Sequence, residues 1–380
     1  MHRWKRLLAL GLMGCQPDQP GVEKVHHDTD TDETTDTAEA GVIAELDDTV
    51  QSLFDGSKMP GFAAAMVANG EVVWVGAYGM ANIEEGHPVT EDTAWLMASV
   101  SKLMTGTAVM QMVEAGLFDL DTPINDVLDF TYDNPKTEDE EVLVKHLVSH
   151  TSGIYDDWVW GAPGQEGALY SDGDSDIALG EFMEGYFLEG GEWYDAQANF
   201  IDALPGEMYM YTNIGASLAG HLIGPAIGEG LDDYSIAALF EPLGMTNSAW
   251  KLAYLDESTV AMPYRLTSDS PVPYGHFGFP DYPDGLLRTS AADMGRFLAA
   301  YANGGQIDGQ MVLEAETVTS MFESIVPEVD PTQGIFWYWS SMNGRDLIGH
   351  NGSDFGVSAE LLLDPVSGVG VVVMTNANWG

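Results

Sequence analysis

The stretch that decides the fold is GFAAAMVANGEVVWVGAYG, residues 61–79. It consists of two apolar runs on either side of Asn69-Gly70, and this pattern is the strongest short signal for a β-hairpin. The C-terminal end of the chain has the same character. Four further segments there indicate strands, namely GIFWYWSS (334–341), RDLIGHNG (345–352), FGVSAELLLDP (355–365) and GVGVVVMTNAN (368–378).

Between these two ends, residues 99–330 show helical patterns that Gly and Pro interrupt, without an internal repeat. We therefore predict an α+β fold of the α/β-sandwich type. One antiparallel sheet is expected from residues 42–98 and 331–380, flanked by terminal helices and carrying the mostly helical region 99–330 as an insertion.

Composition excludes several functions. The chain has 380 residues, 45% of them hydrophobic, which is enough for a large buried core. Its 60 acidic and 13 basic residues give a formal charge of -47, which would repel nucleic-acid phosphates, so nucleic-acid binding is excluded. The acidic excess itself names no substrate. The only cysteine is Cys15, so no intrachain disulfide can form.

The N-terminus, MHRWKRLLALGLMGC, combines a basic start, a short apolar run and Gly14 directly before Cys15. This resembles a bacterial lipoprotein signal, with residues 12–15 as the lipobox; an ordinary secretory signal and a buried thiol are the alternatives. We predict a signal peptide at 1–14, lipidation of Cys15 and location in the cell envelope, on the periplasmic or outer-membrane side. No later stretch is long and apolar enough to cross a bilayer, so the lipid would be the only anchor.

Residues 15–41 contain no aromatic residue and repeat Asp and Thr, which indicates an acidic disordered tether. The folded domain is then expected at 42–380. Residues 28–39 place acids at several positions of a calcium-binding loop, but Glu33 occupies the position that requires glycine. We predict no metal and no cofactor.

Three short motifs carry the chemistry, and each also occurs a second time. Ser99 stands three residues before Lys102, so on a helix the hydroxyl and the amine can touch, but Ser248 and Lys251 have the same spacing. Tyr-x-Asn occurs at 211–213 and at 301–303, and His-x-Gly at 350–352 and at 276–278.

Sequence context separates the candidates. Residues 301–305, YANGG, follow a helical pattern and are typical of a helix C-terminus. The motif at 211–213 lies on a loop before a small-residue helix, and the one at 350–352 adjoins a predicted strand, whereas 276–278 lies in an irregular stretch. Loops held by a rigid scaffold are the usual place for catalytic groups.

In this order the motifs resemble the serine beta-lactamase and penicillin-binding-protein hydrolases, particularly the branch with class C beta-lactamases, D-alanyl-D-alanine carboxypeptidases and related esterases. The resemblance covers nearly all of the chain after Val42. It includes HLVSHTSGI (146–154), PGEMYMYTNIGASLAGHLI (205–223), FEPLGMTNS (240–248), GLLRTSAADMGRFLAAYANGG (285–305) and GHNGSDFGVSAELLLDP (349–365).

The residues permit acyl transfer to Ser99. A serine hydroxyl needs a base; Lys102 can serve if burial lowers its pKa, and Tyr211 can serve as base and later protonate the leaving group. The division of labour between them stays open. Asn213 can hold Lys102 and a substrate amide carbonyl together. The resemblance implies an oxyanion hole formed by the backbone N–H groups of Ser99 and Ser353, each worth about 3 kcal/mol.

His350 and Gly352 belong to the third motif and are predicted to bind substrate. The beta-lactamase branch usually has lysine where this chain has His350, and imidazole is mostly neutral above its reference pKa of about 6.5. Beta-lactam hydrolysis is therefore less expected than peptidase or esterase activity. We expect His350→Ala to weaken substrate binding and to remove a limb near neutral pH from the rate profile.

Three other features bear on the site. Residues 154–200 mix aromatic and acidic side chains and would form either a wall that favours cationic or apolar substrates or a plain surface lid. His146 and His150 lie four apart but lack a third metal ligand, so we predict structural roles. Family members generally continue into a helix after the last strand, whereas this sequence stops at NANWG; it is either a fragment or leaves one sheet face uncovered.

The sequence as a whole predicts an exported serine hydrolase that cleaves an amide or ester through an acyl-Ser99 intermediate. A D-alanyl-D-alanine carboxypeptidase is the first expectation, with the peptidoglycan stem peptide as substrate. A small-ester esterase or a beta-lactamase is the alternative within the family. A catalytically silent envelope protein that binds a muropeptide or a partner is the alternative from another class.

Overall fold

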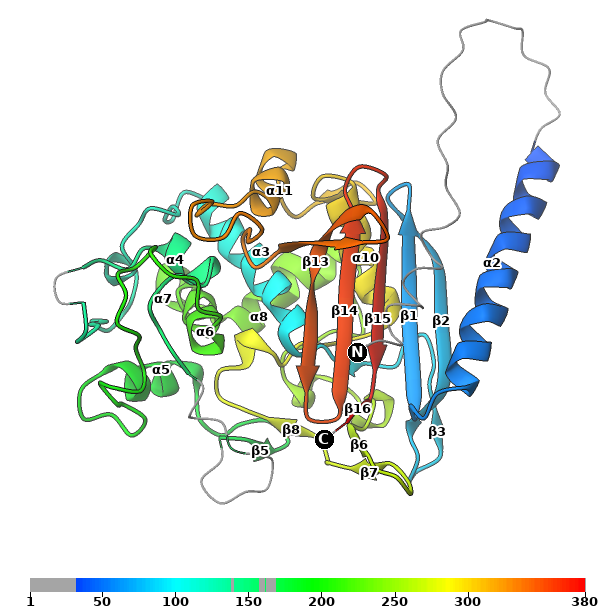
Figure 1. The fold of residues 1–380 in the computed structure, drawn as a ribbon, viewed down its shortest axis with the longest axis horizontal. Coiled ribbons are helices and arrows are strands. Elements are labelled where there is room, and N and C mark those ends of the chain that lie inside the picture. The colour runs from blue at the N-terminus through cyan, green and yellow to red at the C-terminus, as the bar shows by residue number, and fades with distance from the viewer. Residues whose placement is uncertain (1–31, 138–139, 157–160, 162–168, 380) are drawn as a thin grey trace, which may run out of the picture. The chain divides into compact units, whose positions relative to one another are not determined.

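A computed structural model describes residues 32–137, 140–156, 161 and 169–379 (Figure 1). The chain divides into two units, residues 1–58 and 59–380. In the first unit the described part is helix α2 (Asp32–Asp55). The predicted tether at 15–41 is therefore wrong for residues 32–41, which are helical. Acidic residues in the first turn favour a helix N-terminus, and Ala38, Glu39 and Ala40 are strong helix formers. Cys15 lies outside the described residues.

The predicted sheet is present and unites the two ends of the second unit (Figure 1). Its order is β12-β13-β14-β15-β1-β2-β3, and every neighbouring pair is antiparallel. The central pairing of β1 with β15 aligns Phe62 with Thr375 and Val67 with Gly370. The strands are β1 (Gly61–Ala68), β2 (Glu71–Asn82), β3 (His87–Pro88), β12 (Tyr338–Met342), β13 (Arg345–Asp354), β14 (Val357–Asp364) and β15 (Val369–Thr375).

The hairpin that decides the fold forms as predicted. Asn69 and Gly70 have positive φ angles of 53° and 73°, which two-residue turns between twisted strands require. Asn303 donates from Nδ2 to the carbonyl of Gly70 over 2.8 Å, and a Cβ at Gly70 would lie 1.9 Å from Asn303 Oδ1. The second Tyr-x-Asn motif therefore serves this turn through its asparagine.

One predicted strand begins later than expected. Residues 334–337 precede β12 instead of belonging to it, and Phe336 has a φ of 56°. Ile335, Phe336 and Trp337 are fully buried in the core, and the Phe336 N–H donates to the carbonyl of Val148. The chain leaves the strand conformation here because burying three large apolar side chains outweighs the extension of the sheet.

The insertion contains most of the helices, as predicted, and it also contributes to short strand pairs that were not predicted. Its helices are α3 (Ser101–Glu114), α4 (Val144–Val148), α5 (Leu179–Phe187), α6 (Asn213–His221), α7 (Ile223–Ile227), α8 (Leu231–Ser235), α9 (Glu241–Leu243), α10 (Ala291–Ala302) and α11 (Ala315–Phe322). The short pairs are β4 (Trp95–Leu96) with β9 (Arg288–Thr289), β5 (Ser171–Asp172) with β8 (Phe277–Gly278), and β10 (Gln306–Ile307) with β11 (Gln310–Met311). β6 (Tyr264–Leu266) pairs with β7 (Val272–Pro273) and with β16 (Ala377–Trp379).

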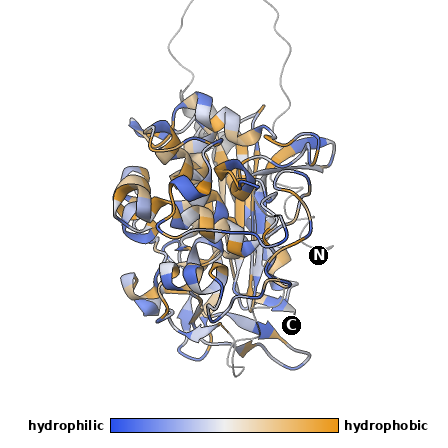
Figure 2. Cartoon of the chain, turned by 90° about the vertical axis from the view of Figure 1, so that its left-hand side faces the viewer, coloured by the Kyte–Doolittle hydropathy of each residue, from blue (hydrophilic) through white to orange (hydrophobic). Residues whose placement is uncertain are grey.

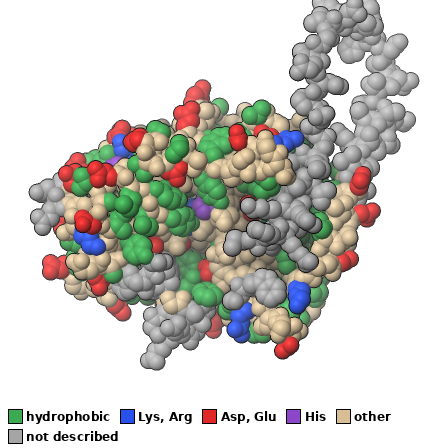
Figure 3. Space-filling view, in the orientation of Figure 1, with side chains coloured by type: hydrophobic (Ala, Val, Ile, Leu, Met, Phe, Trp, Pro, Cys, Tyr) green, Lys and Arg blue, Asp and Glu red, His purple; other side chains and the backbone are tan. Residues whose placement is uncertain are grey.

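Helix α10 packs on β1, β2 and β15. The approach is close, since a Cβ on Gly295 would lie 3.1 Å from Ala65 Cβ. Helix α3 is buried along most of its length and contacts α6. Figure 2 shows hydrophobic residues on the strands and on the helices beside them. Acidic side chains are spread over the face shown in Figure 3 and basic ones are few there. Within the described residues, no helix is long and apolar enough to cross a membrane.

Candidate active site

Ser99 lies in a 3₁₀ turn (Ala98–Val100) that leads directly into α3. Ala98 has a φ of 46°, a strained value for a residue with a Cβ, and such strain is often found at functional sites. Strand β13 crosses next to this turn at Gly352. A Cβ there would lie 2.3 Å from the carbonyl oxygen of Met97 and 3.1 Å from the N of Ser99. Glycine is therefore required for the strand to come this close to the serine.

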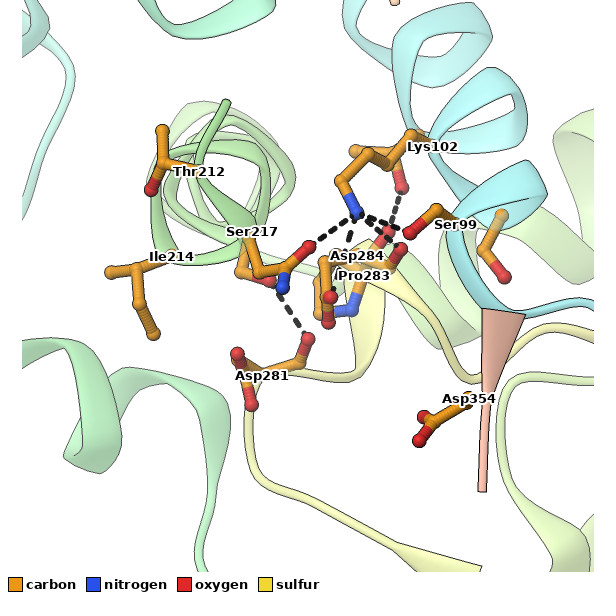
Figure 4. Close-up of polar contacts among 12 residues, drawn as sticks. Ser99, Lys102, Thr212, Ile214, Ser217, Asp281, Pro283, Asp284 and Asp354 are labelled. Carbon is orange, nitrogen blue, oxygen red and sulfur yellow. Dashed lines mark hydrogen bonds and ion pairs between the residues drawn. The ribbon is translucent and has the colours of Figure 1, made fainter. Parts of the chain in front are cut away.

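Lys102 stands one turn into α3 and is completely buried. Its Nζ donates to Ser99 Oγ over 3.3 Å, to Asn213 Oδ1 over 2.7 Å and to the carbonyl of Asp284 over 2.9 Å (Figure 4). Asp284 Oδ2 lies 3.5 Å from the same Nζ. The structure thus brings together the hydroxyl and the amine of the first motif and the amide of the second.

The charge of Lys102 bears on the choice of base. Burial lowers the pKa of Lys102, but the neighbouring Tyr211 and Asp284 outweigh burial, and the net pKa is raised above the ordinary 10.5. The condition under which Lys102 would act as the base, a pKa lowered by burial, is therefore not met. An ammonium cannot accept the proton of Ser99, so a charged Lys102 favours Tyr211 over Lys102 as the candidate base.

Tyr211 lies on the loop before α6, where its ring centroid is 4.9 Å from Lys102 Nζ. The positive charge at this distance stabilises negative charge that develops on the phenol oxygen. The ring also packs against His150, with 4.4 Å between the centroids. His150 Nδ1 accepts from the N–H of Thr212 over 3.3 Å. His150 therefore holds both the ring and the backbone of the second motif.

Sequence analysis did not identify Asp156, which anchors the second motif. Its Oδ2 accepts from Thr212 Oγ1 over 2.9 Å, from the N–H of Ile214 over 2.8 Å and from the N–H of Asn213. The carboxylate therefore caps the N-terminus of α6, where a negative charge is favourable. Burial raises the pKa of Asp156, and the three donors oppose that rise.

The loop around Asp284 was missed as well. Thr105 of α3 donates to the carbonyl of Pro283 over 2.6 Å, and Ser217 of α6 donates to the carbonyl of Asp281 over 2.7 Å (Figure 4). Asp281 and Asp284 are both buried, and burial raises the pKa of both carboxyls, that of Asp284 to about 7. No sequence motif marks this loop, because each contact joins it to a distant helix.

His350 occupies the predicted place beside Tyr211, with 6.2 Å between the ring centroids. Its Nδ1 lies 2.6 Å from the carbonyl of Asn351, and a carbonyl can only accept, so Nδ1 carries the hydrogen. In the neutral ring Nε2 is then an acceptor. Burial and, to a lesser extent, Lys102 lower the pKa of His350 to about 3. The expected titration of His350 near neutral pH is therefore wrong.

Two cavities share Ser99 and Ser353 in their lining. The larger, of about 430 Å³, is also lined by Tyr209, Tyr211, Asp330, Thr332, Gln333, Tyr338, His350 and Asn351. The smaller, of about 140 Å³, is lined by Ala98, Tyr170, Asn213, Phe279, Asp284, Gly285 and Asp354. The expected oxyanion donors, the N–H groups of Ser99 and Ser353, belong to residues at the junction of the two cavities.

The alternative motifs have structural roles. Ser248 Oγ bonds to Thr289 and Asp293, while Lys251 pairs with Asp232, so the second Ser-x-x-Lys is not a pair. Tyr301 is buried and bonds to Thr107. His276 is buried directly before β8.

The structure also shows what the histidine pair and the described part of segment 154–200 contact. His146 Nδ1 accepts from the N–H of Leu143, so both histidines of the HLVSH stretch bind backbone, as predicted. Among the residues that the structure describes, no three His, Cys, Asp or Glu side chains are grouped to hold a metal. Most aromatic rings in the described part of 154–200 pack on one another as anchors, and Tyr170 reaches the smaller cavity.

A buried lysine that joins a serine to an asparagine, beside a tyrosine and next to two cavities, is the arrangement expected in a family of serine hydrolases. The Beta-lactamase family model matches residues 46–379, and the chain belongs to this family. Penicillin-binding protein 4 of Amycolatopsis lactamdurans is 28% identical over 337 residues, covering 84% of this chain and 81% of that protein. Protein flp of Staphylococcus aureus is 23% identical, and the match covers 88% of this chain but only 63% of flp.

Solved structures agree on the fold. The octameric penicillin-binding protein homologue from Pyrococcus abyssi superposes with a TM-score of 0.68 at 25% identity, covering 88% of this chain and 74% of that chain. A class C beta-lactamase superposes with a TM-score of 0.64 at 22% identity, covering 93% and 95%.

Proposed function

We propose that this protein hydrolyses an amide or ester bond through an acyl-Ser99 intermediate. The observation that carries the proposal is the contact of Lys102 Nζ with Ser99 Oγ and Asn213 Oδ1, 4.9 Å from the centre of the Tyr211 ring. Tyr211 reacts as the phenolate beside the Lys102 ammonium, and its oxygen takes the Ser99 proton while Ser99 Oγ attacks the carbonyl carbon. Tyr211 returns that proton to the leaving group as the scissile bond breaks. Water then attacks the acyl-serine, releases the acid and restores Ser99.

The two cavities receive the two halves of the substrate. Tyr211 lines the larger cavity, so the leaving group that it protonates lies there. Asn213 lines the smaller one, and because its Oδ1 is bound to Lys102, its amide N–H₂ is the group that faces an acyl-side carbonyl. The acyl group therefore lies in the smaller cavity.

The lining of the larger cavity disfavours a carboxylate on the leaving group. Among its described residues there is no Lys or Arg, Asp330 contributes an acid, and His350 offers a neutral acceptor. A C-terminal D-alanine, like the carboxylate of a beta-lactam, would lack a partner cation. An esterase or amidase with an uncharged leaving group thus has the better support. The D-alanyl-D-alanine carboxypeptidase remains the second candidate, supported by the similarity to penicillin-binding protein 4.

A substrate panel separates these activities and the silent binding protein. Purified protein would be labelled with a fluorophosphonate and assayed on p-nitrophenyl esters, p-nitroanilides, D-alanyl-D-alanine peptides and cephalosporins. We expect labelling of wild type, loss of labelling in Ser99→Ala and retention in Ser248→Ala. Absence of both labelling and turnover in wild type would refute the hydrolase and favour the silent binder.

We further propose export and a lipid anchor on Cys15, supported by the basic, apolar and small-residue order of the first 15 residues. Expression of the full chain in a bacterial host with labelled palmitate should give a labelled, membrane-associated protein. Cys15→Ser should abolish the label. A wild-type protein that carries no lipid would refute the anchor.

A further inference from the structure

The smaller cavity is acidic, and this property goes beyond what an acyl-transfer site requires. Two carboxyl groups, Asp284 and Asp354, line it, and none of the described lining residues is Lys or Arg. Asp281 and Asp156 carry two further buried or nearly buried carboxyl groups close to Lys102, which is the one cation that acts on all four. Burial raises the pKa of all four carboxyls, and that of Asp354 rises to about 6, which leaves this carboxyl mostly ionised at pH 7.

One lining carboxyl, that of Asp284, keeps a buried oxygen without a partner among the described residues. Asp354 Oδ1 accepts from Tyr170 Oη over 2.9 Å and from the N–H of Phe355 over 2.7 Å, and Asp354 is only partly buried, so its carboxyl is accessible from the cavity that it lines. Asp284 is 5% exposed, and its Oδ1 is buried without a hydrogen-bond partner. Buried carboxylate oxygens normally have donors, so the absence of one next to a cavity indicates that a ligand supplies it.

The rest of the lining suits a small cation. Tyr170 and Phe279 pack edge to face with 5.4 Å between centroids, and aromatic faces attract ammonium groups. Figure 4 shows Asp354 and Asp284 on two different segments near Ser99, at the end of β13 and on the loop before β9. An acyl group held on Ser99 in this cavity therefore shares it with both acids. The volume of about 140 Å³ limits that group to a few non-hydrogen atoms.

We propose that the acyl half of the substrate is a short aminoacyl group whose free ammonium binds Asp354, with Asp284 as the second acid. This assignment rests on the proposed function, because it places the acyl group by the roles of Tyr211 and Asn213. The preferred substrate is then an amide or ester of a small unblocked amino acid. An N-acylated substrate is excluded because it has lost the charge and exceeds the cavity.

Two isosteric pairs test the ammonium alone. Glycyl p-nitroanilide differs from propionyl p-nitroanilide by NH₃⁺ in place of CH₃, and alanyl p-nitroanilide, as either enantiomer, differs from the isobutyryl compound in the same way. We expect wild-type kcat/KM to favour the amine of each pair at least tenfold at pH 7. In Asp354→Asn this ratio should fall at least tenfold. Asp346→Asn removes an exposed charge from the same strand and should leave the ratio unchanged.

Each outcome decides one of the two proposals. A wild-type enzyme that hydrolyses both members equally, or an Asp354→Asn enzyme that keeps the full preference, overturns the ammonium site and leaves the hydrolase intact. If no p-nitroanilide or ester is cleaved and Ser99 is not labelled, the hydrolase itself fails.

A measurement on wild type covers the case in which Asp354→Asn does not fold. Glycinamide and propionamide would compete with fluorophosphonate labelling of Ser99. Protection by glycinamide at a concentration at least tenfold lower supports the site, and equal protection overturns it.

Discussion

Replacing Gly352 by Ala tests the geometry on which the reaction depends. The added Cβ would lie 2.3 Å from Met97 O and 3.2 Å from Ala98 Cβ, so β13 and the serine turn must separate. Normal contact between these atoms is longer, and we estimate a shift of about 1 Å, which can cost about 100-fold in rate. Loss of one oxyanion donor costs about 3 kcal/mol, again about 100-fold in kcat. The overpacking costs about 1–3 kcal/mol of stability.

The assay would measure kcat on a p-nitrophenyl ester, the rate constant of fluorophosphonate labelling and the midpoint of urea unfolding. We expect the first two to fall about 100-fold while the variant stays folded. Gly224→Ala is the matched control, because nothing lies within 4 Å of its added Cβ. A Gly352→Ala enzyme with wild-type kcat and labelling would refute the placement of Ser99 and Ser353 around one oxyanion.

Three other perturbations follow from the buried charges. Lys102→Met should lower kcat about 1,000-fold, whereas Lys251→Met should leave kcat unchanged; steady-state kinetics on a p-nitrophenyl ester would measure both. Burial raises the pKa of Asp284 to about 7, so the folded state retains a proton between pH 4 and 7 that the unfolded state loses, and wild-type stability falls over that range. In Asp284→Asn the melting temperature should fall less between pH 4 and 7 than in wild type, whereas Asp346→Asn, at an exposed position, should show the wild-type fall. An Asp284→Asn variant with the same pH dependence of melting temperature as wild type would contradict the burial argument. His350→Ala should raise KM without changing the shape of the kcat/KM profile from pH 5 to 9, because the pKa of His350 is about 3; loss of a limb near neutral pH would contradict this.

Local patterns were sufficient for the sheet and for the three motifs. The Asn69-Gly70 turn can be recognised in the sequence because few residues adopt positive φ. The apolar runs on either side of this turn are then expected to pair as the two strands of a hairpin. The approach of Ser99 to Lys102 also follows from short spacing alone. Two segments were predicted wrongly. Residues 32–41 are helical because their helix propensity outweighed the acidic composition that indicated a tether. Residues 334–337 are not part of the strand because burial of their side chains in the core outweighed the strand pattern.

The amino-acid sequence by itself determined the family and predicted Ser99 as the nucleophile together with the residue types around it, because these depend on short spacing and on order along the chain. Only the tertiary structure decided their electrostatics. The raised pKa of Lys102, the neutral His350, the anchoring carboxylate of Asp156 and the acids of the smaller cavity all arise from burial among segments far apart in the sequence. Burial and through-space charge set the protonation states, and no local pattern encodes them.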